Sequence, residues 1–133
     1  MKKQGILNAE LSRAIAALGH NDLICIGDAG LPIPKGVPVI DLAVVANLPL
    51  VSQVLEALDS ELVVQEVILA NESDVRNPKL PEFLRDLWPD ADSTRIKHSE
   101  FKAKMSECRF VIRTGEYFPY ANVMLVCGVA FPI

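Results

Sequence analysis

The sequence has no excess of positive charge and no long apolar segment, and each absence excludes a class of protein. Thirteen lysines and arginines against seventeen aspartates and glutamates give a formal net charge of -4, without a basic cluster. Binding to nucleic acid is therefore not expected, because affinity for phosphate backbones depends on concentrated positive charge. The most apolar stretches, residues 62–70 and 123–131, are far shorter than the roughly 20 residues of a membrane-spanning helix, so no membrane partner is expected.

The cysteines do not form a disulfide pattern. Cys25, Cys108 and Cys127 are odd in number, each lies in an apolar run, and no two are spaced as a CxxC pair. Reduced core thiols in a reducing compartment are therefore predicted. The start of the chain also lacks a signal-peptide pattern, because the apolar part after its two lysines is a single Ile-Leu pair. We expect a cytoplasmic protein.

Several chemical signatures are missing as well. Residues 27–30 read Gly-Asp-Ala-Gly rather than GxGxxG, and neither GxxxxGK[ST] nor GxSxG occurs. The chain has no HExxH pair and no Cys/His spacing of the zinc type. A cysteine nucleophile paired with a histidine remains open, although an apolar run predicts a buried, poorly reactive thiol. The remaining chemistry is acid/base catalysis on a small polar ligand, without metal or cofactor.

Apolar residues are plentiful, and their pattern predicts one α/β domain over residues 1–133. Half of the residues are apolar, and the length fits a single domain. Helical spacing marks a helix that begins after Asn8 and ends at Gly19, and another along residues 50–58. Apolar runs predict strands at residues 23–27, 37–45, 62–70, 110–113 and 122–129. We expect a three-layer α/β/α domain with a central, largely parallel or mixed sheet, and any antiparallel pairing at its edges.

The middle of the chain is less regular. Residues 71–81 are polar and contain two prolines, which predicts a loop. A short helix is predicted at residues 82–88, ended by Pro89. A small strand at residues 94–97 and a helix at residues 98–105 are expected to follow.

The two histidines are candidates for moving protons. His20 directly follows the helix predicted to end at Gly19, near the negative end of its dipole, and histidine has an ordinary pKa of about 6.5. It is a candidate acid or base, the alternative being that it caps carbonyl groups at the helix end. His98 begins the predicted helix 98–105, where it could bind a ligand or be an ordinary surface residue.

Polar side chains next to predicted strands are candidates for ligand binding. Asp28 follows the strand at residues 23–27, and ligands of α/β sheets bind beyond the carboxyl ends of strands. Its carboxylate could bind sugar hydroxyls or orient a histidine, or it could form an Asx-turn with its own backbone. Tyr120 and Asn122, between the last two strands, offer the donors, acceptors and aromatic face that suit a polyol. A wide hairpin with a polar rim is the alternative there.

Five short motifs together resemble the ribose pyranase and fucose mutarotase family. They are Lys-Gln-Gly-Ile-Leu-Asn at 3–8, Leu-Gly-His at 18–20, Asp-Ala-Gly-Leu-Pro at 28–32, Ile-Arg-Thr-Gly-Glu at 112–116 and Pro-Tyr-Ala-Asn at 119–122. The resemblance runs from residue 2 to about residue 131, and residues 71–95 are its least distinctive part. Gly30 and Ala121 favour the ribose branch, because the fucose branch typically has a histidine and a glycine there.

The resemblance implies an isomerase that converts the β-pyranose form of D-ribose to the β-furanose form, which a ribokinase accepts, without metal or coenzyme. His20 matches the family's proton donor, and Asp28, His98, Tyr120 and Asn122 match its sugar-binding positions. The family also forms homo-oligomers, commonly decamers, with sugar sites near subunit boundaries, which suits so apolar a chain. The alternatives are a mutarotase for another aldose such as fucose, or a sugar-binding module that would not need His20.

Overall fold

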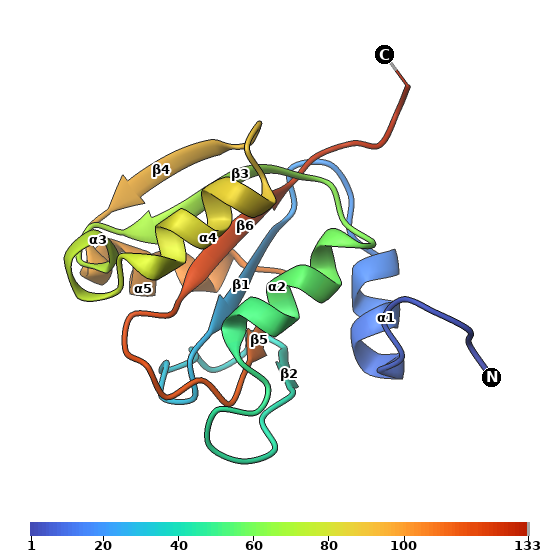
Figure 1. Cartoon of the computed structure of the whole chain (residues 1–133), viewed down its shortest axis with the longest axis horizontal. Helices are drawn as coiled ribbons and strands as arrows, with labels where there is room; N and C mark the ends of the chain where they lie inside the picture. Colours follow the sequence, from blue (N-terminus) through green and yellow to red (C-terminus); the bar gives the residue numbers. More distant parts are fainter. Residues whose placement is uncertain (133) are drawn as a thin grey trace.

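The computed structural model describes residues 1–132 and shows strands covered by helices on both sides (Figure 1). The elements, in chain order, are α1 (Ala9–Ala16), β1 (Leu23–Gly27), β2 (Val39–Asp41), α2 (Val51–Asp59), β3 (Val64–Ala70), α3 (Ser73–Arg76), α4 (Lys79–Leu87), β4 (Asp92–Ile96), α5 (His98–Lys104), the 3-10 helix η1 (Met105–Glu107), β5 (Phe110–Arg113) and β6 (Val123–Cys127). The strands form one sheet in the order β2-β5-β1-β6-β3-β4.

The sheet is mixed, and only β6 among these strands runs against the others. β1 and β2 pair in parallel with β5, and β3 pairs in parallel with β4, whereas β6 is antiparallel to both β1 and β3. The prediction of antiparallel pairing at the edges is therefore wrong, because β6 lies in the middle of the sheet. The carboxyl ends of β1 to β5 and the amino end of β6 meet along one side, which we call the carboxyl end of the sheet.

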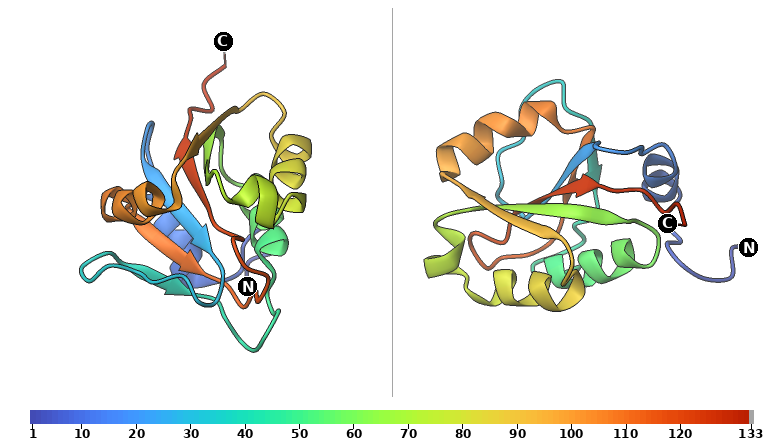
Figure 2. Two further views of the ribbon diagram at one scale, coloured as in Figure 1. Left: turned by 90° about the vertical axis from the view of Figure 1, so that its left-hand side faces the viewer. Right: turned by 90° about the horizontal axis from the view of Figure 1, so that it is seen from above.

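Side chains that alternate along β1 divide the core into two layers. Ile24 and Ile26 belong to a buried cluster shared with α1, α2 and α4, whereas Cys25 belongs to a second cluster shared with α5. Figure 2 shows α2 and α4 on one side of the sheet and α5 on the other. The predicted three-layer α/β/α arrangement is confirmed. No helix within residues 1–132 combines the length and hydropathy needed to cross a bilayer.

The contribution to stability of the buried cluster between the sheet and α1, α2 and α4 can be tested at Leu55 of α2, which is fully buried. Leu55→Ala leaves a cavity and is expected to lower the free energy of unfolding by roughly 2–5 kcal/mol. Urea denaturation at a fixed protein concentration measures the change. Leu7→Ala is the matched control, because Leu7 is 63% exposed and such surface changes stay within about 0.5 kcal/mol. Equal effects of both variants would contradict this assignment of the core.

Helix α1 begins where the sequence predicts and ends earlier. The Asn8 side chain accepts a hydrogen bond from the Leu11 backbone N–H at 2.9 Å, which confirms the predicted N-cap. The last helical residue is Ala16, so the prediction that Gly19 ends the helix is wrong. The left-handed conformation expected of that glycine belongs instead to Asn21, with a φ of 70°.

Residues 71–81 are largely helical, which overturns the prediction of a loop. They contain α3 and the start of α4, and Pro78 is the N-cap residue of α4. Pro81 lies in the first turn of this helix, where a backbone N–H has no partner within the helix in any case. The two prolines therefore mark the beginning of a helix, not a segment without one.

Strand β2 is much shorter than the predicted strand at residues 37–45. Its pairing with β5 stops at Asp41, whose Oδ1 accepts a hydrogen bond from the Ala43 N–H at 3.0 Å. This contact is an Asx-turn, which competes with continued strand pairing. The valines that follow, Val44 and Val45, are consequently exposed rather than buried in the sheet.

Candidate functional site

Four of the five candidate residues come together at the carboxyl end of the sheet. Asp28 follows β1, His98 is the first residue of α5, and Tyr120 and Asn122 precede β6. These four side chains and Lys102 line a cavity of about 200 Å³. The pairing of β6 with β1 brings Asn122 beside Asp28, although the two are distant in the sequence.

Asp28 and Asn122 are joined directly. The Asn122 Oδ1 accepts a hydrogen bond from the Asp28 backbone N–H at 2.9 Å, and Asn122 is only 6% exposed. The Asp28 Oδ1 accepts a hydrogen bond from the Gly30 N–H at 3.0 Å, so the Asx-turn weighed as an alternative is present. The same carboxylate also lines the cavity, so the Asx-turn and a binding role are compatible. A side chain at Gly27 would collide with Leu31, which explains the glycine there.

His98 is fixed at the start of α5. Its backbone N–H donates to both carboxylate oxygens of Glu72, at 3.2 and 3.3 Å. Its ring is half-buried, lies 5.1 Å from the Tyr120 ring at 61°, and is stacked 6.5 Å from Phe101. His98 is therefore held by contacts from three directions, unlike an ordinary surface residue.

The backbone around Tyr120 is held by buried polar side chains of residues 71–81, the segment that the sequence predicts as a loop. The Ser73 hydroxyl donates to the Tyr120 carbonyl at 3.4 Å, and the Asn77 amide donates to the Pro119 carbonyl at 3.3 Å. Tyr120 has a φ of 58°, a conformation that a non-glycine residue keeps only when its surroundings impose it. Sequence reasoning missed Ser73 and Asn77, because nothing local shows which segment they touch.

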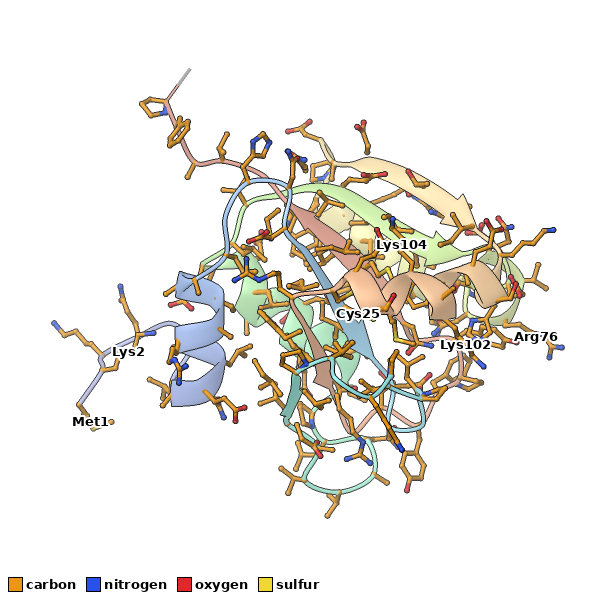
Figure 3. The ribbon with its side chains drawn as sticks, turned by 180° about the vertical axis from the view of Figure 1, so that it is seen from behind. Met1, Lys2, Cys25, Arg76, Lys102 and Lys104 are labelled. Atoms are coloured by element: carbon orange, nitrogen blue, oxygen red, sulfur yellow. The ribbon has the colours of Figure 1, made fainter. Side chains whose placement is uncertain are left out.

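Lys102 is a further cavity residue that sequence reasoning missed. It follows His98 by one helical turn, so both side chains lie on the same face of α5. Figure 3 shows Lys102 and Lys104 on this helix, and only Lys102 lines the cavity with Asp28. Its ammonium group can donate hydrogen bonds to ligand hydroxyls. The spacing from His98 was the available signal.

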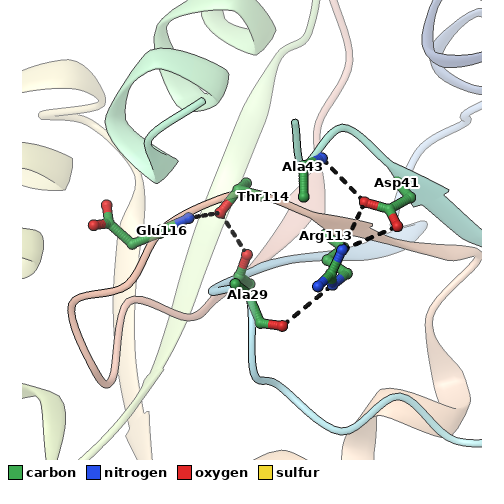
Figure 4. A network of polar contacts seen from close by, with 7 residues as sticks. Ala29, Asp41, Ala43, Arg113, Thr114 and Glu116 are labelled. Carbon is green, nitrogen blue, oxygen red and sulfur yellow. Dashed lines mark hydrogen bonds and ion pairs between the residues drawn. The ribbon is translucent and has the colours of Figure 1, made fainter. Parts of the chain in front are cut away.

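Arg113 and Thr114 form hydrogen bonds to the backbone on either side of Asp28 (Figure 4). The Arg113 Nη1 lies 3.2 and 3.1 Å from the two carboxylate oxygens of Asp41, and its Nε donates to the Ala29 carbonyl at 3.2 Å. The buried Thr114 hydroxyl donates to the Gly27 carbonyl at 2.8 Å. These contacts tie β5 and β2 to the turn that carries Asp28.

His20 lies at the opposite end of the sheet from this cavity. It precedes β1, whereas Asp28 follows it, and five strand residues span roughly 16 Å. The His20 Nε2 is 3.1 Å from the Gln65 Oε1 near the start of β3. One chain therefore does not bring His20 to the other candidates. The capping alternative is not observed either, because α1 already ends at Ala16.

The part of the chain that the structure describes offers neither a reactive thiol nor a metal cluster. Cys25, Cys108 and Cys127 are free and buried. Burial raises the pKa of Cys108 to about 12 and that of Cys127 to about 11, and it raises the pKa of Cys25 well above its usual value. Thiolate is therefore scarce at neutral pH, as predicted. Residues 1–132 contain no group of three or more His, Cys, Asp or Glu side chains arranged to hold a metal ion.

Comparison with known proteins gives matches along nearly the whole chain. The model of the RbsD / FucU transport protein family matches residues 1–130. Proteins named D-ribose pyranase are 44% identical in Lactiplantibacillus plantarum and 47% in Geobacillus thermodenitrificans, covering 98% of this chain and 100% and 99% of the relatives. The structure of Bacillus subtilis RbsD complexed with D-ribose matches with a TM-score of 0.94 at 44% identity, covering 98% of this chain and 100% of that one.

Proposed function

Because the chain belongs to the RbsD / FucU transport protein family, we propose that it is an isomerase that interconverts the β-pyranose and β-furanose forms of D-ribose. This proposal is carried by the 44% and 47% sequence identity, over 98% of this chain, to proteins named D-ribose pyranase. It favours the ribose reading over a fucose mutarotase and over a binding module without turnover. In this proposal, residues 1–133 act as one domain.

The cavity at the carboxyl end of the sheet is the proposed sugar site. The Asp28 carboxylate accepts hydrogen bonds from ribose hydroxyls, and the Asn122 amide, whose Oδ1 is already used, donates from its Nδ2. The rings of His98 and Tyr120, 5.1 Å apart, form one wall and offer further polar atoms. A cavity of about 200 Å³ suits a monosaccharide, not a longer chain of sugars.

Ring opening and ring closure each need two coupled proton transfers, and neither includes a redox step. A proton leaves the anomeric hydroxyl, the bond between C1 and the ring oxygen breaks, and that oxygen takes up a proton to give the open aldehyde. The O4 hydroxyl then adds to C1, loses its proton, and the aldehyde oxygen is protonated to give the furanose. His20 is the proposed proton donor, since one imidazole can both accept and return a proton near neutral pH.

This mechanism requires that a second copy of the chain supplies His20. His20 and the cavity lie at opposite ends of the sheet in one chain, so the proposed site joins unlike ends of two copies. Such a head-to-tail contact closes into a ring when the rotation between copies allows it. Exposed Val44, Val45 and Tyr117 line a cavity that also includes Asp28, which supports association around the site. A homo-oligomer, commonly a decamer in the family that the motifs resemble, is therefore part of the proposal.

The proposal also includes a cellular role. We place the protein in the cytoplasm, where free thiols stay reduced, and in ribose catabolism, where the furanose form would be supplied to ribokinase. Nucleic acid is not a proposed partner, since the net charge is -4. A membrane is not a proposed partner either, since no helix within residues 1–132 is long and apolar enough to cross one.

The experiment that tests the function is NMR magnetisation transfer on D-ribose, with and without the protein. Faster transfer between the β-pyranose and β-furanose anomeric signals is the expected result. Acceleration with L-fucose but not with ribose would replace the proposal by the fucose alternative. Line broadening of ribose without faster exchange would leave a sugar-binding module.

A further inference from the structure

A chain of side-chain hydrogen bonds leads away from His20. The His20 Nε2 lies 3.1 Å from the Gln65 Oε1, and the Gln65 Nε2 donates to the Asn21 Oδ1 at 2.6 Å. The ring of His20 has no other hydrogen-bond partner within residues 1–132. Gln65 is therefore the side chain that can orient this histidine within one copy.

The backbone at the Asn21 end of this chain of hydrogen bonds is fixed. The Asn21 N–H donates to the Cys127 carbonyl at 2.9 Å, which attaches the turn after α1 to the end of β6. Asn21 has a φ of 70°, so the turn has a specific, sharply bent form. A residue anchored on β6 thus sets the direction of the Gln65 amide.

Gln65 lies at an irregularity in the sheet. The register between β3 and β6 shifts between Val64 and Glu66, so Gln65 is the additional residue on β3. A bulge of this kind turns a side chain out of the regular alternation, and bulges are frequent next to active sites. The bulge and the hydrogen bonds are two independent observations, and both indicate a specific role for Gln65.

The arrangement determines where the proton of His20 resides. The Gln65 amide nitrogen is occupied as a donor to Asn21, so its oxygen faces the imidazole, and an amide oxygen can only accept. The His20 Nε2 must therefore carry a hydrogen whether the ring is neutral or charged. Proton exchange with a ligand is left to Nδ1.

We propose that Gln65 is a positioning residue, which holds His20 in the tautomer protonated at Nε2 so that Nδ1 exchanges the proton with the sugar. This inference rests on the proposed role of His20. The Nδ1 lone pair takes the proton from the anomeric hydroxyl while the ring is opened, and the resulting Nδ1–H returns a proton to an oxygen of the sugar. The Nε2–H remains bonded to Gln65 throughout. Because Nδ1 returns one proton for each proton that it accepts, the histidine has the same number of protons after each turnover as before it.

Three variants test the kinetic part of the proposal. Gln65→Met keeps the length of the side chain without an acceptor, and it is expected to lower kcat about five- to tenfold. KM is expected to stay within about twofold, because Gln65 contacts His20 and is not among the side chains that line the sugar cavity. Gln65→Glu restores an acceptor and is expected to recover most of the rate. Gln4→Met, at an exposed position, is the matched control. An unchanged kcat in Gln65→Met would overturn the proposal.

The tautomer can be measured without any turnover. The chain has only two histidines, so ring ¹⁵N spectra contain two patterns, and a His98→Asn variant assigns them. The proposal expects neutral His20 to carry its proton on Nε2, with a proton signal that Gln65→Met weakens and Gln65→Glu retains. A proton on Nδ1 in the unsubstituted protein would overturn it. A failure to accelerate ribose exchange would contradict the proposed function instead, and the two failures are therefore distinguishable.

Discussion

His20→Ala is expected to slow the catalysed exchange of ribose ring forms by roughly 10²–10⁴-fold, the range that a positioned acid/base group contributes. The remaining rate would approach that of ribose in water. Ribose affinity should change less than the rate, because Asp28, His98, Tyr120 and Asn122 line the cavity and are intact in this variant. Magnetisation transfer gives the rate, and calorimetric titration with ribose gives the affinity.

His98→Ala is the matched control for this result. His98 lines the cavity and contacts the Tyr120 ring. Its loss should therefore weaken ribose binding more than it lowers the rate at which bound ribose is converted. The two histidine variants are therefore expected to have opposite patterns of kcat and KM. Full activity of His20→Ala would show that another group moves the proton.

Mixing two inactive variants is expected to restore activity. A His20→Ala chain keeps an intact cavity, and an Asp28→Asn chain keeps His20 and retains an oxygen for the Asx-turn to Gly30. If each site combines two copies, about one quarter of the sites in an equal mixture contain neither substitution. Co-expression followed by the magnetisation-transfer measurement would detect this, since each variant alone should be nearly inactive.

A second mixture provides the control for this experiment. In an equal mixture of wild-type chains and chains carrying both His20→Ala and Asp28→Asn, about one quarter of all sites should be active if each site joins two copies, but about one half if each site belongs to one chain. Activity that only equals the sum of the parents in the first mixture would contradict the shared site. Light scattering confirms that the mixed chains still assemble.

The sequence predicts the parts of this molecule that depend on short-range patterns. Asn8 identifies the start of α1, and the apolar run before Asp28 identifies β1 and its end. The motif that contains Tyr120 and Asn122 indicates a polar ligand, and both residues line the cavity. In each case, neighbours along the chain determine the outcome.

The parts that could not be predicted depend on contacts between distant segments. The central position of β6 follows from pairing with β1 and β3, which the apolar pattern of β6 alone does not specify. The location of His20 relative to Asp28 follows from the direction of β1 within the finished sheet. Ser73, Asn77 and Gln65 support their neighbours through hydrogen bonds across more than forty positions, so no spacing in the sequence indicates them.

The central antiparallel strand also has a consequence for how the chain acquires its structure during synthesis. β6 is made after the other five strands of the sheet, yet it joins β2-β5-β1 to β3-β4. While the ribosome is still adding residues before Val123, the two parts of the sheet have no strand between them, and β1 and β3 each lack a partner along one side. Because unpaired strands favour association with other chains, the nascent protein depends on rapid docking of β6, and a stall in translation just before Val123 should leave it prone to aggregation.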